Sequence, residues 1–138
     1  MNYQDDFYLF VQGGHIAIQQ QDALSAWNLF QAAAVLNPKN TLPQIGLGYL
    51  YLQTQQFKQA AHTFEQVLEK EPSNEMTKAF LGFTTSFLPR GLEKGEKILA
   101  ESCHSENPLI RKLGSAAISF VECYLRRPPG PAERVFKS

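Results

Sequence analysis

The chain has 138 residues, enough for one domain with a continuous core. Its 13 basic residues balance its 13 acidic residues, so no net charge attracts nucleic acid or an anionic membrane. The first residues, Met-Asn-Tyr-Gln-Asp-Asp, lack the basic and apolar parts of a secretory signal. The sequence also has no run of about 18 apolar residues that would predict a membrane span. We therefore expect a cytoplasmic protein.

Two antiparallel helices are predicted at the start, over residues 3–20 and 23–36. Asp22 follows the turn between them and has the side chain of a helix N-cap. The adjacent Gly13 and Gly14 each lower helix stability by roughly 1 kcal/mol relative to alanine. A close crossing of the second helix accounts for Gly14, whereas a bend is one alternative for Gly13.

A second helical hairpin is predicted over residues 41–54 and 57–70. Gly48 on its first helix and Ala60 on its second are small where two helices cross closely. Pro72 cannot continue the second helix, because proline has no amide hydrogen and restricts the residue before it.

Six positions of this hairpin fit the 34-residue tetratricopeptide (TPR) pattern: Leu47, Gly48, Tyr51, Ala60, Phe64 and Pro72. Only the Trp position differs, and Gln44 occupies it. The chain therefore resembles the TPR family, in which each repeat is two antiparallel helices. One hairpin cannot bury its apolar face alone, so the resemblance implies neighbouring repeats.

A first repeat over residues 7–40 lies 34 positions earlier than the hairpin of residues 41–74. Its matching positions are Gly14, Ala26, Phe30 and Pro38. Phe10 takes the large aromatic position, while Gly13 and Ala17 depart from the Leu and Tyr of the pattern.

A third repeat is predicted over residues 75–107. Its first helix, over residues 75–87, is in register because Leu81-Gly82 follows Leu47-Gly48 by 34 residues. Ser73 is its predicted N-cap.

The second half of this repeat is out of register, since Pro108 comes two residues late. Pro89-Arg90-Gly91 is the predicted turn before a helix over residues 92–104. In that helix Gly95 and Leu99 replace the Ala and Phe of the pattern, as terminal repeats often diverge.

A capping helix is predicted over residues 108–126, with Pro108 at its first position after Asn107. Its predicted buried stripe consists of Leu109, Leu113, Ala116, Ala117, Phe120, Val121 and Tyr124. The basic residues Arg111, Lys112 and Arg126 are expected outside that stripe.

The predicted fold class is all-α, with three TPR helical hairpins and the capping helix in a right-handed superhelix that has a concave groove. The TPR domain would span residues 1–127. The Pro-rich residues 128–138 are expected to form a flexible tail.

No catalytic, cofactor or metal site is predicted. The histidines His15, His62 and His104 have no Cys, Asp or Glu at a metal-ligand spacing, and adjacent helical side chains such as Cys103 and His104 point about 100° apart. Cys103 and Cys123 are expected to be free thiols, with a disulfide as the alternative. The sequence also lacks a phosphate-binding glycine loop and a basic stripe for nucleic acid, so we expect no enzyme.

In the TPR family, four positions of each first helix face the concave groove. The resemblance places ten client-binding residues there: Tyr8, Val11, His15, Leu42, Ile45, Tyr49, Leu52, Met76, Ala79 and Phe83, with Ile18 and Ser86 at the remaining positions. This set is almost wholly apolar or aromatic. It lacks the Lys, Asn and Arg with which TPR co-chaperones clamp acidic tails.

Two interpretations of this apolar set remain open. The residues could be ordinary core, covered by a C-terminal helix that folds back into the groove. The signature residues already supply a core between the helices, however, and a further apolar patch is typical of a binding site. We therefore favour a groove for an amphipathic or apolar helix of a client protein.

Small TPR proteins with an apolar groove and a capping helix are similar to the export chaperones of bacterial type III secretion. The resemblance implies that the protein holds an aggregation-prone helical client without ATP, either the needle subunit or a hydrophobic translocator. A first repeat that begins within ten residues of the start favours the needle branch, which typically works with a small second protein in a heterodimer.

The competing function is a structural scaffold or adaptor that assembles a stable complex or a homodimer. Trp27 and Phe57 are candidates for a binding patch on the convex side. We expect instead that both pack between repeats.

Overall fold

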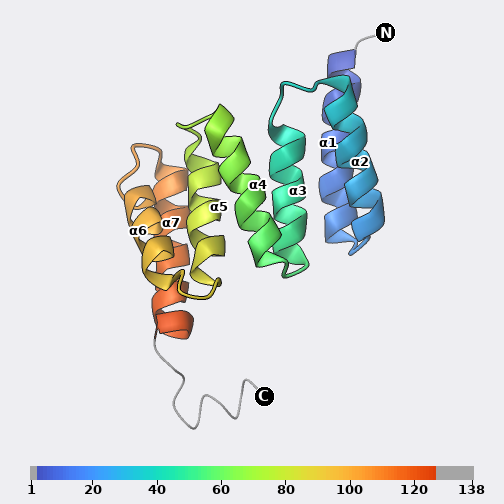
Figure 1. Ribbon diagram of the computed structural model, residues 1–138. Coiled ribbons are helices and arrows are strands. Elements are labelled where there is room, and N and C mark those ends of the chain that lie inside the picture. Colours follow the sequence, from blue (N-terminus) through green and yellow to red (C-terminus); the bar gives the residue numbers. More distant parts are fainter. Residues whose placement is uncertain (1–2, 127–138) are drawn as a thin grey trace. The chain divides into compact units, whose positions relative to one another are not determined.

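Helices make up the computed structural model, which describes residues 3–126 (Figure 1). Their bounds are α1 Tyr3–Gln19, α2 Ala23–Leu36, α3 Leu42–Gln53, α4 Phe57–Lys70, α5 Glu75–Ser86, α6 Leu92–Ser102, α7 Pro108–Phe120 and the π-helix η1 Val121–Arg126. Each α-helix begins within one residue of its predicted start, so the all-α prediction is confirmed. The predicted tail, residues 128–138, lies outside the described residues.

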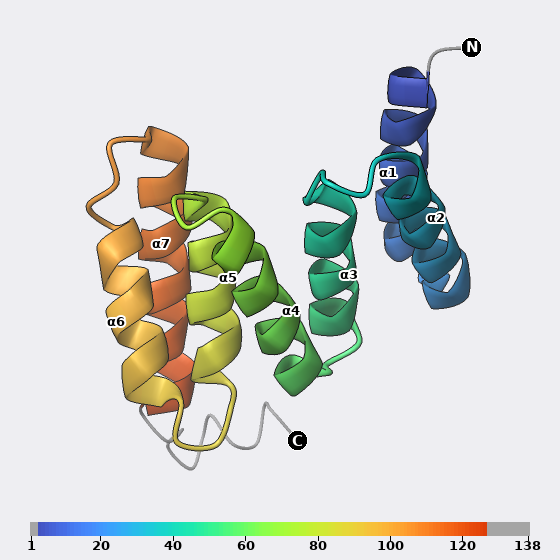
Figure 2. The same cartoon turned by 45° about the horizontal axis from the view of Figure 1, so that its top comes forward.

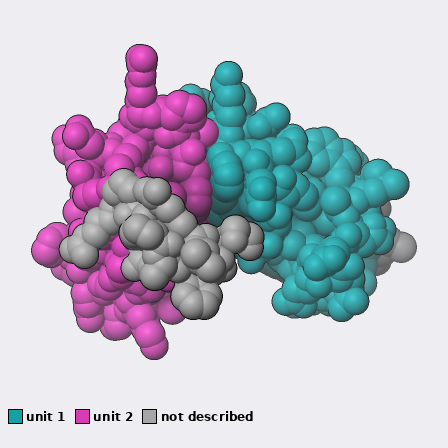
Figure 3. Space-filling model, turned by 90° about the horizontal axis from the view of Figure 1, so that it is seen from below, with its two compact units in different colours: residues 1–77 teal, residues 78–138 magenta. Residues whose placement is uncertain are grey.

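The chain divides into two compact units, Met1–Thr77 and Lys78–Ser138, which we call unit 1 and unit 2 (Figure 3). The boundary lies inside α5. Unit 1 holds the first two hairpins, and unit 2 holds the rest of α5 with α6, α7 and η1. The single TPR domain and its concave superhelix remain predictions.

Unit 1 consists of two hairpins that pack on each other. α1 packs against α2 and α3 packs against α4, while α3 also contacts both helices of the first hairpin (Figure 1). The core of the first hairpin and its junction with α3 consists of Phe7, Val11, Ala17, Ala26, Phe30, Ala33 and Leu50. Phe30 and Phe64, the large signature residues of the two hairpins, are completely buried.

The aromatic ring of Phe30 lies between Gly14 of α1 and Gly46 of α3. A Cβ atom added at Gly14 would lie 2.5 Å from the ring, and one added at Gly46 would lie 2.4 Å from it, closer than Cβ contacts occur in proteins. The same arrangement recurs one repeat later, where a Cβ at Gly48 would lie 2.5 Å from Phe64. The close approach predicted at Gly14 is therefore confirmed.

Gly13 has a milder packing role. α1 continues through it without interruption. A Cβ atom at Gly13 would lie 3.3 Å from a methyl carbon of Leu29, so the missing side chain leaves room for Leu29 on α2.

The turns inside the two hairpins of unit 1 share one geometry. Gln21 and Gln55 have φ angles of 60° and 62°, in the left-handed region. In each turn the next residue donates its N–H to the carbonyl five positions earlier, as in a Schellman motif. The Asp22 amide donates to the Ala17 carbonyl at 2.9 Å, and the Gln56 amide donates to the Tyr51 carbonyl at 2.8 Å. The Asp22 carboxylate also accepts from the Ser25 amide at 3.0 Å, which confirms it as the N-cap of α2.

Gln55→Gly is expected to raise the free energy of unfolding by about 0.5–1 kcal/mol. A left-handed conformation costs an L-residue roughly 1–2 kcal/mol, and glycine offsets only part of this gain through its greater unfolded-state entropy. Urea denaturation followed by circular dichroism checks the change. The matched control is Gln31→Gly at an exposed position within α2, which should lower stability by about 1 kcal/mol. Equal destabilisation by both variants would contradict the claim that Gln55 is strained in its left-handed conformation.

The loop from α4 to α5 shows one correction. The N-cap of α5 is Asn74 rather than the predicted Ser73, because the Asn74 side chain accepts from the Thr77 amide at 3.0 Å. Asn74 also donates to Glu71 at 2.9 Å, and the Thr41 hydroxyl donates to the other Glu71 oxygen at 2.8 Å. The hydrogen bond from Asn74 is the larger cause, and that from Thr41 the smaller, of a Glu71 pKa below its ordinary value.

Unit 2 keeps the close packing expected of the divergent repeat. A Cβ at Gly95 of α6 would lie 2.6 Å from the carbonyl oxygen of Gly82 on α5, and Leu99 is completely buried. Gly95 and Leu99 therefore occupy the small and large positions, as predicted. The turn before α6 contains Arg90 with a φ of 61°.

α7 lies beside α6 in both ribbon views (Figures 1 and 2). α7 begins at Pro108 as predicted, and Asn107 is its N-cap, because the Asn107 side chain accepts from the Leu109 amide at 2.9 Å. The predicted stripe is wrong in part: Leu109 is 61% exposed and Tyr124 is 51% exposed, and Ala116 and Phe120 are exposed too. The buried residues are Ile110, Gly114 and Val121. Apolar residues of α7 extend beyond its buried side, so helical spacing alone predicted too broad a stripe.

The last turn is the π-helix η1 instead of a continuation of the α-helix to residue 126. Within it Val121 is buried, and Arg126 forms an ion pair with Glu96 of α6. The exposure predicted for Arg111, Lys112 and Arg126 is confirmed.

Candidate functional site

Six predicted groove residues on α1 and α3 of unit 1 keep part of their surface exposed, and we call this set the α1–α3 face. They are Tyr8, His15, Leu42, Ile45, Tyr49 and Leu52. Tyr8 and Leu42 are 42% and 38% exposed, and the other four are half-buried. The rings of His15 and Tyr49 lie 6.1 Å apart, so the structure joins the α1 and α3 parts of the face.

This part of the chain is almost free of charge. Residues 7–57 contain Asp22 and Lys39 as their only Asp, Glu, Lys or Arg, whereas such residues make up 19% of the whole chain. α2 and α3 contain none. A charged side chain buried on the α1–α3 face would therefore find no ionic partner on α3, so the face favours an apolar partner surface.

His15 is the polar exception on the face. Its imidazole packs edge-on against Phe30 at a centroid distance of 5.1 Å and also contacts Tyr49, at 6.1 Å. Burial lowers the pKa of His15 below its ordinary value of 6.5, because desolvation disfavours the charged imidazolium.

Two predicted client-binding residues are buried in the structure. Val11 is 7% exposed and belongs to the core with Phe7 and Phe30, and Ala79 is 2% exposed. Neither can present its side chain to a partner in this conformation. Met76 lies half-buried at the start of α5.

Phe83 of unit 2 is covered by the C-terminal helix. Its ring contacts Phe87 at 5.1 Å and Phe120 of α7 at 5.7 Å, and Phe120 in turn contacts Tyr124 at 5.0 Å. Phe83 therefore agrees with the alternative interpretation, in which a C-terminal helix folds back and covers the predicted groove residues. The candidate site therefore narrows to the α1–α3 face.

Trp27 and Gln44 serve the packing of unit 1. Trp27 of α2 meets the signature residue Tyr51 of α3 edge-on at 6.0 Å, so its expected packing between repeats is confirmed. Gln44, at the Trp position of the pattern, donates to Gln66 of α4 at 3.1 Å. A polar contact within the hairpin thus replaces an aromatic one.

Sequence reasoning missed a set of aliphatic residues on the first hairpin. Leu9 and Ile16 of α1 are 64% and 57% exposed, and Leu24 and Val35 of α2 are 72% and 78% exposed. They lie opposite the core side of their helices. The signal that could have found those on α2 is its uncharged and mostly apolar composition.

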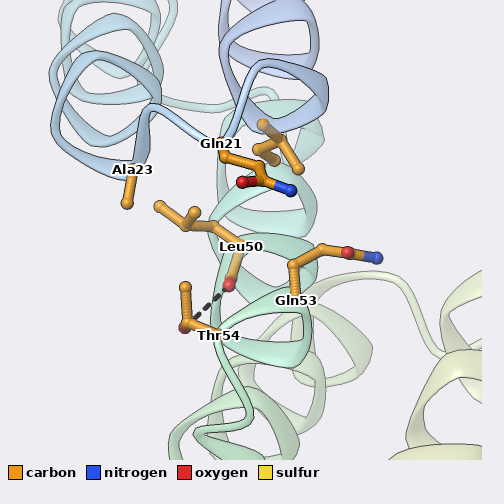
Figure 4. Close-up of a pocket in the computed structure, with 6 residues that line it drawn as sticks. Gln21, Ala23, Leu50, Gln53 and Thr54 are labelled. Carbon is orange, nitrogen blue, oxygen red and sulfur yellow. Dashed lines mark hydrogen bonds between the residues drawn. The ribbon is translucent and has the colours of Figure 1, made fainter.

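A small pocket of about 220 Å³ lies in unit 1 between the first hairpin turn and the end of α3 (Figure 4). Its lining residues are Ile18, Gln21, Ala23, Leu50, Gln53 and Thr54. The Thr54 hydroxyl donates to the Leu50 carbonyl at 3.0 Å and is thereby occupied. Small-molecule sites usually measure about 300–1,000 Å³, so the pocket favours no small ligand.

Within residues 3–126, no three His, Cys, Asp or Glu side chains lie together as a metal site. Cys103 and Cys123 are free thiols, as predicted. None of the described helices is long and apolar enough to cross a membrane.

Comparison with known proteins supports the repeat assignment. Residues 17–81 match a family model described as Tetratricopeptide repeat, which covers α2, α3 and α4 with the adjoining parts of α1 and α5. The match supports an all-α TPR protein, and hence a protein-binding module. No curated protein matches the chain significantly.

Proposed function

We propose that this TPR module holds an apolar or amphipathic helix of a client protein on its α1–α3 face, as an ATP-independent export chaperone of bacterial type III secretion. The observation that carries the proposal is the face itself: six positions on the paired helices α1 and α3, exposed or half-buried, with no Asp, Glu, Lys or Arg among them. Helix-in-groove binding uses apolar anchors of this kind.

The client class follows from the chemistry of the face. An aggregation-prone helix, such as that of a needle subunit or a hydrophobic translocator, presents a stripe of apolar side chains. Burial of roughly 600–1,000 Å² of such surface could offset the ordering of a disordered client. Binding would block the client's self-association in the bacterial cytoplasm, with or without a small co-chaperone in a heterodimer.

The residues proposed to contact the client differ in their roles. Tyr49 of α3 contacts His15 of α1 and supplies an aromatic anchor, a residue type enriched among binding hot spots. Leu42 and Tyr8 are the most exposed and reach the client first. Ile45 and Leu52 form the apolar floor between them.

The test is mass spectrometry of proteins that copurify with the tagged full chain from its own cell, wild type beside Tyr49→Glu. A small helical partner, secreted or polymerising and lost in the variant, is the expected result. Recovery of the same partners with both proteins would place binding elsewhere. A partner that is neither secreted nor polymerising would overturn the chaperone role but retain the face.

A scaffold or adaptor is the second candidate, favoured by the exposed Leu24 and Val35 on α2. This surface would assemble a stable complex or a homodimer. Val35→Glu would then disrupt the assembly while Tyr49→Glu would not. Size-exclusion chromatography with light scattering separates a homodimer from a monomer.

A further inference from the structure

We propose that His15 acts as a pH-sensitive contact between the two hairpins of unit 1, which loosens the α1–α3 face when the imidazole gains a proton. The stability effect is independent of any client. Only the final step, release of a bound helix on acidification, rests on the proposed function.

The geometry places one imidazole against both neighbouring helices. His15 belongs to α1, and its ring meets Phe30 of α2 at 5.1 Å with an interplanar angle of 73°. It also meets Tyr49 of α3 at 6.1 Å with an angle of 60°. Phe30 is itself fixed between the glycines of α1 and α3, so the imidazole packs against a rigid neighbour.

A protonated His15 would find little to compensate its charge. α2 and α3 contain no charged residue. On α1, Asp5 and Asp6 precede His15 by ten and nine residues, about 13–15 Å along the helix axis. The Asp22 carboxylate already accepts from the amide and hydroxyl of Ser25. The remaining titratable residues of these three helices are Tyr3, Tyr8, Tyr49 and Tyr51.

The direction of the pH effect follows from burial. Desolvation lowers the pKa of His15 in the folded state below the ordinary 6.5. The folded state therefore prefers the neutral imidazole, and the stabilisation is fully present above pH 6.5 and is lost as the pH falls below it.

Two carboxylates also have lowered pKa values, but they act in a different range. Hydrogen bonds from Ser25 hold the pKa of Asp22 below its ordinary 3.8, and those from Asn74 and Thr41 hold that of Glu71 below 4.5. Their contribution to stability is present above these ordinary values and is lost as the pH falls from them through the lowered folded-state values. The interval from pH 7.5 to 5 therefore separates the histidine effect from the carboxylates.

The test compares full-chain wild type, His15→Phe and His62→Gln by urea denaturation at pH 7.5 and pH 5. His62 is exposed on α4 and provides the matched control. Acidification should raise the unfolding equilibrium constant of wild type about three- to tenfold more than that of His15→Phe, whose phenyl ring keeps the packing without a titrating group. His62→Gln should behave as wild type.

Two results would overturn the proposal: equal pH dependence in wild type and His15→Phe, or an imidazole that titrates at or above pH 6.5. A cation–π contact with Phe30 or Tyr49 would produce the latter. An NMR titration of the wild-type histidines measures the titration of the His15 imidazole directly. This measurement tests the proposal even if His15→Phe fails to fold.

The release step is tested with the partner captured at neutral pH. His15 belongs to the α1–α3 face, so the amount of partner captured at pH 7.5 is measured first for each protein. Washing at pH 5.5 should then elute a larger fraction of the captured partner from wild type than from His15→Phe. Equal retention by the two proteins would overturn release, whereas an absence of any groove-dependent partner at pH 7.5 would count against the proposed function alone.

Discussion

Phe30→Ala is expected to lower the free energy of unfolding of unit 1 by about 3–5 kcal/mol. The side chain is completely buried, and its ring occupies the space that Gly14 and Gly46 leave open. Removing the ring therefore leaves a cavity that the backbones of α1 and α3 must close by moving. Fluorescence of Trp27, the single tryptophan, follows unfolding of unit 1 in urea.

Val35→Ala is the matched control for Phe30→Ala. Val35 lies on the same helix but is 78% exposed, so its truncation should change stability by less than about 0.5 kcal/mol. If Phe30→Ala lowered the free energy of unfolding no more than Val35→Ala does, that result would contradict the packing of the ring between the two glycines.

A second set of variants tests the pairing of ring and glycine. Gly46→Ala should destabilise wild type, because the new Cβ would collide with the Phe30 ring. In a Phe30→Leu background the same change should cost less, with a coupling free energy of about 0.5–3 kcal/mol. Additive effects of the two substitutions would mean that Gly46 and Phe30 do not interact.

Leu42→Glu and Tyr49→Glu are expected to weaken binding of the captured partner by about 100-fold or more. Each places a carboxylate on a face without cations, where burial against an apolar helix leaves it unpaired. Isothermal titration calorimetry with the purified partner measures the loss.

The two substitutions differ in their effect on stability, which separates binding from folding. Leu42 is the first residue of α3 and 38% exposed, and an acidic residue is favourable at a helix N-terminus, so Leu42→Glu should leave stability nearly unchanged. Tyr49→Glu also removes the contact with His15 and should cost roughly 1 kcal/mol. Full affinity in Leu42→Glu would contradict the α1–α3 face as the binding site.

Much of the fold was predictable because helix crossings require matched small and large residues. The 34-residue spacing from Gly14 to Gly48 and from Phe30 to Phe64 marks those crossings, and the structure places each glycine against its ring. Caps were less certain, since Ser73 and Asn74 are adjacent residues that can each accept an amide hydrogen bond.

The candidate site was predictable only in part. Helical periodicity identifies apolar positions but cannot tell which of them a neighbouring element covers. Val11 and Ala79 are buried, and Phe83 is covered by Phe120, whose orientation depends on the packing of α7. Apolar residues of α7 extend beyond its buried side, as the exposed Leu109 shows, so helical spacing predicted too broad a stripe.

Site-specific photocrosslinking in the protein's own cell tests the central claim most directly. A photoreactive amino acid at position 8 or 42 samples the α1–α3 face, and one at position 35 samples the opposite side of the first hairpin. We predict that positions 8 and 42 give a covalent adduct with the same small helical protein and that position 35 gives none. An adduct from position 35 alone would contradict binding on the α1–α3 face.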